Sequence, residues 1–271
     1  MMKPSILILC GSSPRHIYVA NKLCQSNDVI AIVQETGTNW SVEKILKLLR
    51  KPNIFFRKVW RWLRDRKRYA GNPEKRFFFG DKPAAFDRPD LIFNVPHINH
   101  PDVVELAKTS QPDVIVVFGT SLIKNELLDM GKYGIVNLHG GLSPQYRGAD
   151  CTFWVLYNGE PDQAGCTIHF INQGIDTGKL IAHVCPPVKA TDNELTLFWR
   201  AVQESAEVYV QVVQRLVAGE RLGQVQTSKG RLYQVKDRGW RHEQQLKRQM
   251  QDGLLKNMDL PLRVTWFTED I

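Results

Sequence analysis

The sequence predicts an α/β fold: a doubly wound, mostly parallel β-sheet with a basic helical insertion and a small C-terminal extension. Short β-branched apolar runs recur along the chain, and stretches with helical periodicity separate them. This pattern is typical of buried parallel strands and their crossover helices. The first run also passes through a Gly-Ser turn directly into a helix, as at the start of a doubly wound sheet.

The predicted strands are apolar runs bounded by turn residues. They are expected at 5–10, 28–34, 113–118, 134–139, 165–171 and 179–188. The last two are expected to be neighbours, because only the turn NQGIDTG separates them.

Helices are expected at 16–26 and near 101–110, between predicted strands. A longer helix is expected to begin at a capping box formed by Thr191 and Glu194 and to stop at Gly219. Its apolar periodicity continues without a break, which indicates a helix packed along the sheet.

The chain is expected to divide into a main domain at 1–222 and a small extension at 223–271. The extension contains VQTSKGRLYQV, which is interpreted as a hairpin with Gly230 at its turn. A polar helix is expected near 241–251. The segment at about 41–80 interrupts the α/β alternation and is interpreted as an insertion of two helical pieces broken at Pro52.

Composition favours a cytoplasmic protein. No run of about 18 apolar residues suggests a membrane-spanning helix, and the N-terminal apolar run is too short for a secretory signal. The five cysteines are odd in number and contain no C-x-x-C pair, which argues against a disulfide framework or a metal site. Cys151 is interpreted as a small buried side chain in preference to a nucleophile.

The net charge of +8 is concentrated in one segment. The stretch from Lys44 to Arg68 contains eleven Lys or Arg residues and a single acidic residue, Asp65, so the rest of the chain is close to neutral. A general nucleic-acid-binding surface is therefore not expected.

The same segment contains a basic amphipathic pattern. Its apolar residues share one helical face and are Phe55, Phe56, Val59, Trp60 and Leu63. One hypothesis is peripheral contact of 44–68 with an anionic membrane or binding of an anionic acceptor. The favoured alternative is a helix packed on the domain with a solvated charged face.

Three side chains form the candidate catalytic centre. Asn137 and His139 lie two residues apart at the end of a predicted strand, so they point to the same side. That end of a parallel strand is where open α/β sheets bind ligands. Asp176 follows in a glycine-flanked turn. An amide, an imidazole and a carboxylate suit acyl transfer without a covalent enzyme intermediate.

The spacing of these residues is similar to that of the folate-dependent formyltransferase family. That family includes glycinamide ribonucleotide, methionyl-tRNA and sugar N-formyltransferases. The resemblance covers roughly 5–35 and 110–235, and its motif residues are Asn137, His139, Pro144 and Gly148, followed by GCTIHFINQGIDTG at 165–178.

The resemblance implies a Rossmann-like sheet, 10-formyltetrahydrofolate as formyl donor, and no metal. It places the catalytic roles on Asn137, His139 and Asp176. Asn137 and protonated His139 would donate hydrogen bonds to the oxyanion, while Asp176 would keep His139 charged. His169, inside a predicted strand, is interpreted as structural or as a supporting residue.

The resemblance also implies two binding regions. The folate pocket would use Phe118, Gly119, Ser121, Leu122, Ile123, Gly174 and Ile175. The acceptor would contact Gly11, Ser12, Ser13, Gly140, Gly141 and Pro144, because a Gly-Ser turn before a helix suits an anion and a Gly-Gly loop allows close backbone approach.

The acceptor is expected to be the amine of a nucleotide-linked amino sugar. About 50 residues follow Leu222, too few for the C-terminal barrel of methionyl-tRNA formyltransferases, and SKGRLYQVKD resembles the extensions of enzymes that act on nucleotide sugars. Three alternatives remain open: another amine acceptor such as glycinamide ribonucleotide, hydrolysis of the formyl donor, and an inactive folate- or nucleotide-sugar-binding protein. The oligomeric state is not predicted.

Overall fold

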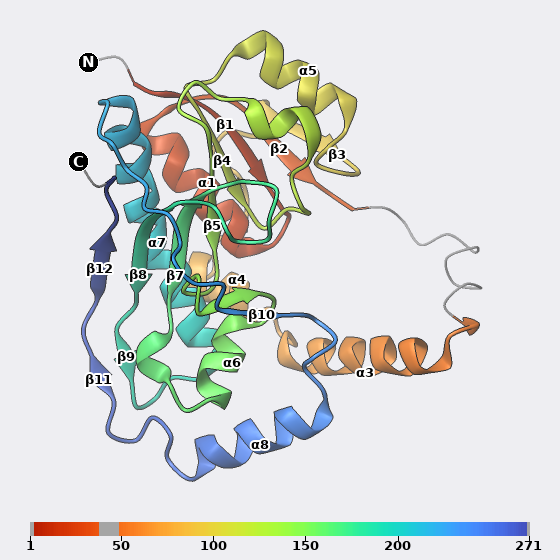
Figure 1. Cartoon of the computed structure of the whole chain (residues 1–271). Helices are drawn as coiled ribbons and strands as arrows, with labels where there is room; N and C mark the ends of the chain where they lie inside the picture. Colours follow the sequence, from red (N-terminus) through yellow and green to blue (C-terminus); the bar gives the residue numbers. More distant parts are fainter. Residues whose placement is uncertain (1–2, 38–48, 270–271) are drawn as a thin grey trace.

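The computed structural model describes residues 3–37 and 49–269. The strands of its central sheet are β1 (Ser5–Cys10), β2 (Asp28–Glu35), β3 (Ile92–Val95), β4 (Val114–Phe118), β5 (Ile135–His139), β7 (Cys166–Phe170), β8 (Leu180–Cys185) and β12 (Arg263–Trp266). Their order is β12-β8-β7-β5-β4-β1-β2-β3 (Figure 1). The pairs from β3 to β5 are parallel, and β7, β8 and β12 extend the sheet antiparallel. The predicted mostly parallel, doubly wound sheet is confirmed.

Strand β1 is buried on both faces, and this explains its continuous apolar run. Ile6 and Ile8 pack toward α1 (Pro14–Ser26) and α7 (Glu194–Val217). Leu7 and Leu9 pack on the opposite face, toward α5 (Pro101–Ser110). Alternate residues of a strand point to opposite faces, so only apolar residues fit throughout.

The start of α7 differs from the prediction. Asn193, not Thr191, caps the helix, and its side chain accepts hydrogen bonds from the backbone N–H groups of Leu195 and Thr196 at 2.9 and 3.1 Å. Asn193 is better placed because it immediately precedes the first helical residue, Glu194.

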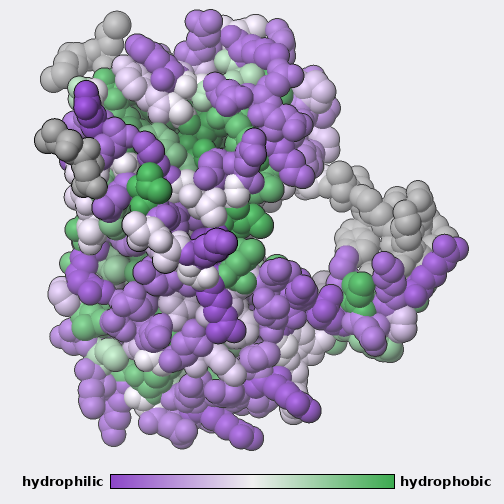
Figure 2. All heavy atoms as spheres, in the orientation of Figure 1, coloured by the Kyte–Doolittle hydropathy of each residue, from purple (hydrophilic) through white to green (hydrophobic). Residues whose placement is uncertain are grey.

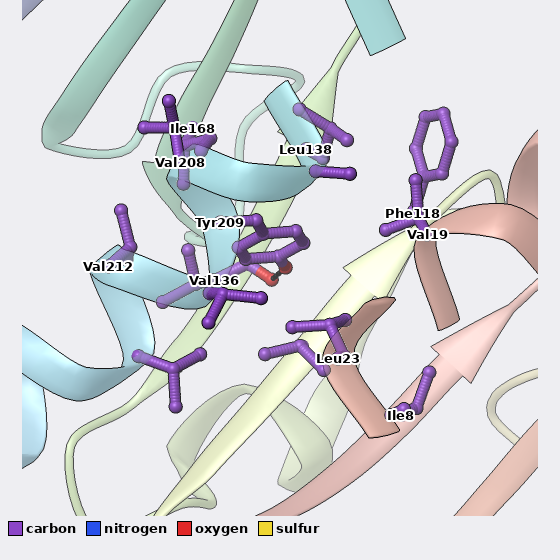
Figure 3. Close-up of a cluster of buried hydrophobic side chains, with 14 of the residues drawn as sticks. Ile8, Val19, Leu23, Phe118, Val136, Leu138, Ile168, Val208, Tyr209 and Val212 are labelled. Carbon is purple, nitrogen blue, oxygen red and sulfur yellow. Dashed lines mark hydrogen bonds between the residues drawn. The ribbon is translucent and has the colours of Figure 1, made fainter. Parts of the chain in front are cut away.

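Tyr209 of α7 joins the helix to the centre of the sheet. Its ring lies in the core among Val136, Leu138 and Val208 (Figure 3). The hydroxyl donates to the Val136 carbonyl at 2.6 Å and accepts from the Val117 N–H at 2.9 Å. It therefore bridges β4 and β5 next to Asn137, which pairs with Val117 in β4.

Replacing Tyr209 by phenylalanine is expected to lower the free energy of unfolding by about 1–3 kcal/mol, because two buried backbone groups lose their partner. Urea denaturation would measure the change. Tyr133→Phe is the control, since no hydrogen bond of the Tyr133 hydroxyl is found within the described chain. Equal stability of both variants would show that the bridge contributes nothing.

The C-terminal segment packs and pairs with the rest of the chain. The predicted hairpin at Gly230 does not form, because β10 (Arg231–Tyr233) pairs in parallel with β6 (Tyr146–Gly148). The Tyr233 ring stacks on Trp154, with ring centroids 4.8 Å apart. Burial of this ring (3% exposed) favours the long-range pairing over a local turn.

Short elements complete this part of the molecule. They are α6 (Cys151–Tyr157), α8 (Trp240–Gln251), β9 (Val188–Lys189), β11 (Asp259–Leu260) and the 3₁₀ turns η1 (Pro89–Leu91), η2 (Asn125–Asp129) and η3 (Pro161–Gln163). Strand β9 pairs with β11, so the single strand predicted at 179–188 is two strands separated by two prolines.

The insertion contains α3 (Pro52–Arg68) and α4 (Pro73–Phe79). The helical piece expected before Pro52 lies largely outside the described residues. In α3 no residue is buried: Phe55 and Trp60 are half-buried, whereas Phe56, Val59 and Leu63 are exposed. The choice between a helix packed on the domain and one that binds an anionic partner stays a prediction. No helix in 3–37 or 49–269 combines the length and apolar character needed to span a bilayer.

Candidate active site

The carboxyl ends of β4 and β5 border a cavity of about 760 Å³. Asn137 and His139 line it from β5, and Asp176 lines it from the turn between β7 and β8. The three predicted catalytic residues are thus brought to one cavity, at the end of the parallel strands where this fold class binds its ligands.

The Asp176 carboxylate contacts three other residues of the site. One carboxylate oxygen, Oδ2, accepts the Gly148 N–H at 2.8 Å and lies 3.5 Å from His139 Nδ1. The other, Oδ1, lies 3.6 Å from His169 Nε2. Gly178 is required to make the turn, because a Cβ there would lie 1.6 Å from the Phe170 carbonyl oxygen.

His169 orients Asn137. Its Nδ1 lies 2.8 Å from the Phe170 carbonyl oxygen, so the proton belongs on Nδ1 and Nε2 accepts from the Asn137 amide at 3.2 Å. Within 3–37 and 49–269 the second amide N–H has no protein partner, and Asn137 lines the cavity. Sequence reasoning gave His169 a structural or supporting role, and the register that places it opposite Asn137 has no local sequence signal.

His139 is almost fully enclosed. Its Nε2 lies 3.1 Å from the Tyr146 carbonyl oxygen and its Nδ1 faces Asp176. Burial lowers the pKa of His139, and the Asp176 charge opposes this effect only in part. The lowered pKa favours the neutral imidazole before ligands bind, because the lost hydration of the cation outweighs the carboxylate. The charged His139 that the resemblance implies for the reaction stays a prediction.

Asp176 itself is ionised. Burial alone would raise its pKa, but the charge of His139 when protonated and the Gly148 N–H, which donates to Oδ2, lower the pKa to about 2. A neutral base beside a fixed negative charge can take up a proton, because the resulting cation is paired at once.

Replacing Asp176 by asparagine is expected to lower the pKa of His139 further. The variant removes the negative charge that favours the imidazolium, so protonation must shift to lower pH. Titration of the histidine ring signals by NMR would measure both midpoints. A higher midpoint in Asp176→Asn would contradict this arrangement.

Cys151 is close to the site, with Sγ 3.6 Å from His139 Nε2. Burial, followed by the charge of Asp176, raises the pKa of its thiol well above the usual range. A raised pKa keeps the thiol protonated, and only the thiolate is a strong nucleophile. Cys151 therefore fits a small buried side chain, as interpreted from the sequence, better than a nucleophile.

All seven residues expected in the folate pocket line the cavity: Phe118, Gly119, Ser121, Leu122, Ile123, Gly174 and Ile175. Two of them, Leu122 and Ile175, expose 42% and 44% of their surface, giving the cavity apolar walls. The loop after β4 is fixed by Glu35, whose carboxylate accepts from the N–H and hydroxyl of Ser121 at 2.6 and 2.7 Å.

Of the residues expected to bind the acceptor, only Gly140 lines the cavity. Gly11, Ser12, Ser13, Gly141 and Pro144 do not. The His16 ring occupies the space beside the first turn: a Cβ on Gly11 would lie 2.6 Å from His16 Nδ1. Gly141 is packed similarly tightly against Cys151.

Several cavity residues were not predicted. Arg15 and His16 line it from α1, Phe198 from α7, and 232–235 from the C-terminal segment. Burial lowers the pKa of His16 to about 3, which leaves Arg15 as the cation on that wall. The 232–235 stretch lies within SKGRLYQVKD, which resembles the extensions of enzymes that act on nucleotide sugars, and the pairing of β10 with β6 brings it here.

Comparison with curated proteins finds partial matches. The chain is 34% identical over 138 residues to methionyl-tRNA formyltransferase of Azobacteroides pseudotrichonymphae, covering 51% of this chain and 42% of that protein. It is 38% identical over 122 residues to the enzyme so named in Citrifermentans bemidjiense, covering 44% and 38%. The chain thus matches about two fifths of each relative's length.

Solved structures share the fold. A sugar N-formyltransferase from a Shewanella species matches with a TM-score of 0.58 and 16% identity over 99% of both chains. Glycinamide ribonucleotide transformylase 1 from Symbiobacterium toebii matches with a TM-score of 0.54 and 18% identity, over 81% of this chain and 90% of that one.

The family model described as "Formyl transferase" matches residues 29–213. The matched range contains β4 and β5, which border the cavity, and it contains Asn137, His139 and Asp176. This match covers more than half of the sequence, and the chain belongs to the formyl transferase family.

Proposed function

We propose that this protein transfers a formyl group from 10-formyltetrahydrofolate to the primary amine of a nucleotide-linked amino sugar. The observation that carries the proposal is the convergence of Asn137, His139 and Asp176 on one cavity. This cavity offers a free amide N–H, a neutral base and a fixed carboxylate to a single reacting centre.

Each group has a distinct role in the reaction. The acceptor nitrogen bonds to the formyl carbon, and the formyl C=O becomes an oxyanion that the free N–H of Asn137 stabilises. Neutral His139 takes the proton released by the attacking nitrogen and is then paired with Asp176. The proton passes to N10 as the C–N10 bond breaks, which releases tetrahydrofolate and the formamide.

The cavity fits a folate. Phe118, Leu122 and Ile175 provide apolar walls for an aromatic ring system, while the backbone of 119–123 is exposed to the same space. Glu35 holds this loop in place by accepting two hydrogen bonds from Ser121, and Glu35 is itself positioned by the Ile98 N–H, which donates to it at 2.9 Å. A preformed wall of this kind lowers the ordering cost of binding.

The acceptor side favours an anionic, extended amine. Arg15 lies on this wall with its guanidinium 5.6 Å from the Phe198 ring centroid, and 232–235 line the same cavity. Arg15 pairs with Glu74 at 2.8 Å, so a phosphate-bearing group would bind the guanidinium N–H groups that this ion pair leaves. The fold match to the Shewanella sugar N-formyltransferase extends through the C-terminal segment as well.

The five free cysteines suit the reducing cytoplasm.

The test is amine-dependent release of tetrahydrofolate. Purified protein would be incubated with 10-formyltetrahydrofolate and, separately, 3-amino and 4-amino nucleotide sugars and glycinamide ribonucleotide. Release only with a nucleotide sugar is the expected result. Release only with glycinamide ribonucleotide would reject the acceptor class, and equal release without any amine would identify a hydrolase.

A further inference from the structure

Helix α3 turns its apolar side away from the protein. Arg64 and Arg68, which share one side, pair with Glu243 and Glu194 of the body at 3.2 and 2.8 Å. Phe56 and Leu63 lie roughly 110° around the helix from this side, given 3.6 residues per turn. The arginine side thus holds α3 to the protein, and in 3–37 and 49–269 no buried core cluster includes Phe56 or Leu63.

Exposure of the side chains confirms this orientation. The exposed apolar residues of α3 are Phe56 (68%), Val59 (37%), Trp62 (57%) and Leu63 (54%). Figure 1 shows α3 standing away from the sheet along most of its length, and Figure 2 shows apolar side chains among hydrophilic ones there. An exposed apolar strip on a helix about 25 Å long is typical of an interaction surface.

Charge indicates what covers this strip. The stretch 50–68 holds nine Lys or Arg residues and one acid, Asp65, which pairs with Arg64. Within the described residues, Arg57, Arg61, Arg66 and Lys67 form no ion pair with a carboxylate. The occupant must therefore be anionic and must also bury apolar side chains.

We propose that α3 binds an anionic lipid bilayer surface, with Phe56, Val59, Trp62 and Leu63 in the interface. A bilayer supplies both requirements, since its headgroups attract Lys and Arg and its acyl boundary accepts the apolar side. A second copy of the chain would oppose two equally basic helices. Nucleic acid would satisfy the charges but would leave the apolar strip in water.

The same helix lies next to the catalytic cavity. A cavity of about 270 Å³ lies between α3 and the body; Arg61 and Arg68 line it, and it shares Arg15, Gly140 and Phe198 with the catalytic cavity. A bilayer-bound α3 therefore holds the acceptor wall of the active site close to the membrane.

Co-sedimentation of the full chain with lipid vesicles tests the proposal. Vesicles of phosphatidylcholine would be compared with an equimolar mixture of phosphatidylglycerol and phosphatidylcholine, at low ionic strength where charge effects are largest. Binding is expected to the mixed vesicles only. Phe56→Gln with Leu63→Gln is expected to weaken it by at least about tenfold, because two apolar contacts are lost. Arg66→Gln with Lys67→Gln is expected to weaken it by about 30-fold.

Matched controls carry the same chemical changes elsewhere. Lys108→Gln with Lys132→Gln removes two exposed charges near α5, and Val225→Gln removes an exposed apolar side chain. Both are expected to bind vesicles like the unaltered protein. Failure to bind mixed vesicles, equal loss in the controls, or self-association of the protein through α3 in place of vesicle binding would overturn the proposal.

Discussion

Replacing Asn137 by alanine is expected to lower kcat about 100- to 1,000-fold, the usual effect of removing one oxyanion donor. The KM for the folate donor should change little, because Asn137 acts on the reacting oxygen while the pocket walls hold the donor. The structure supports this role, since His169 occupies one amide N–H of Asn137 and leaves the other for the cavity.

Asn137→Asp sharpens the test. Aspartate has nearly the shape of asparagine but, when ionised, no donor to offer, so its rate should be as low as that of the alanine variant. Asn94→Ala, on the exposed edge strand β3, is the control and should leave the rate unchanged. A near-normal kcat for Asn137→Asp would remove Asn137 from the mechanism.

Replacing Arg238 by methionine is expected to lower the free energy of unfolding by about 3–5 kcal/mol, the range for breaking a buried ion pair. The Arg238 side chain is 1% exposed. It binds Glu194 twice, at 2.8 and 2.9 Å, Glu243 at 2.7 Å and Asp150 at 3.0 Å. Methionine retains apolar volume but leaves these carboxylates without their central cation.

The pH dependence of this effect has a defined sign. Burial would raise the pKa of Glu194, but Arg238 and Arg68 lower it. The stabilisation is therefore fully present above the unfolded-state pKa and is lost as the pH falls through the lower folded-state value. The difference between Arg238→Met and the unaltered protein should shrink on acidification.

Urea denaturation at several pH values would measure the difference in the free energy of unfolding between Arg238→Met and the unaltered protein. Arg215→Gln removes an exposed pair with Glu220 and should cost less than about 1 kcal/mol. A loss of that size for Arg238→Met would contradict the importance of the buried cluster.

Much of the sheet was predictable from sequence because its inner strands are buried on both faces. Continuous apolar runs locate β1 and β4 without knowledge of their neighbours. The edge strand β3 was missed because its two central residues, Phe93 and Asn94, are exposed, so no apolar run marks it. Strand β10 was mispaired because Tyr233 is buried by residues far away in the chain.

The candidate site, like the sheet, was predictable from sequence only in part. Asn137, His139 and Asp176 were found from their spacing, and the structure brings them to one cavity. Their protonation was not predictable, because the desolvation of His139 depends on the surrounding fold. The role of His169 depends on strand register, and the outward apolar face of α3 depends on partners for Arg64 and Arg68 that lie far along the chain.

The most direct test uses 10-formyltetrahydrofolate labelled with ¹³C in the formyl group. The protein, a 4-amino or 3-amino nucleotide sugar and this donor would be incubated, and the sugar product examined by mass spectrometry. We expect a nucleotide sugar carrying the labelled formyl group, formed by the unaltered protein and nearly absent with His139→Ala. Labelled free formate with an unmodified sugar, or equal product from His139→Ala, would contradict it.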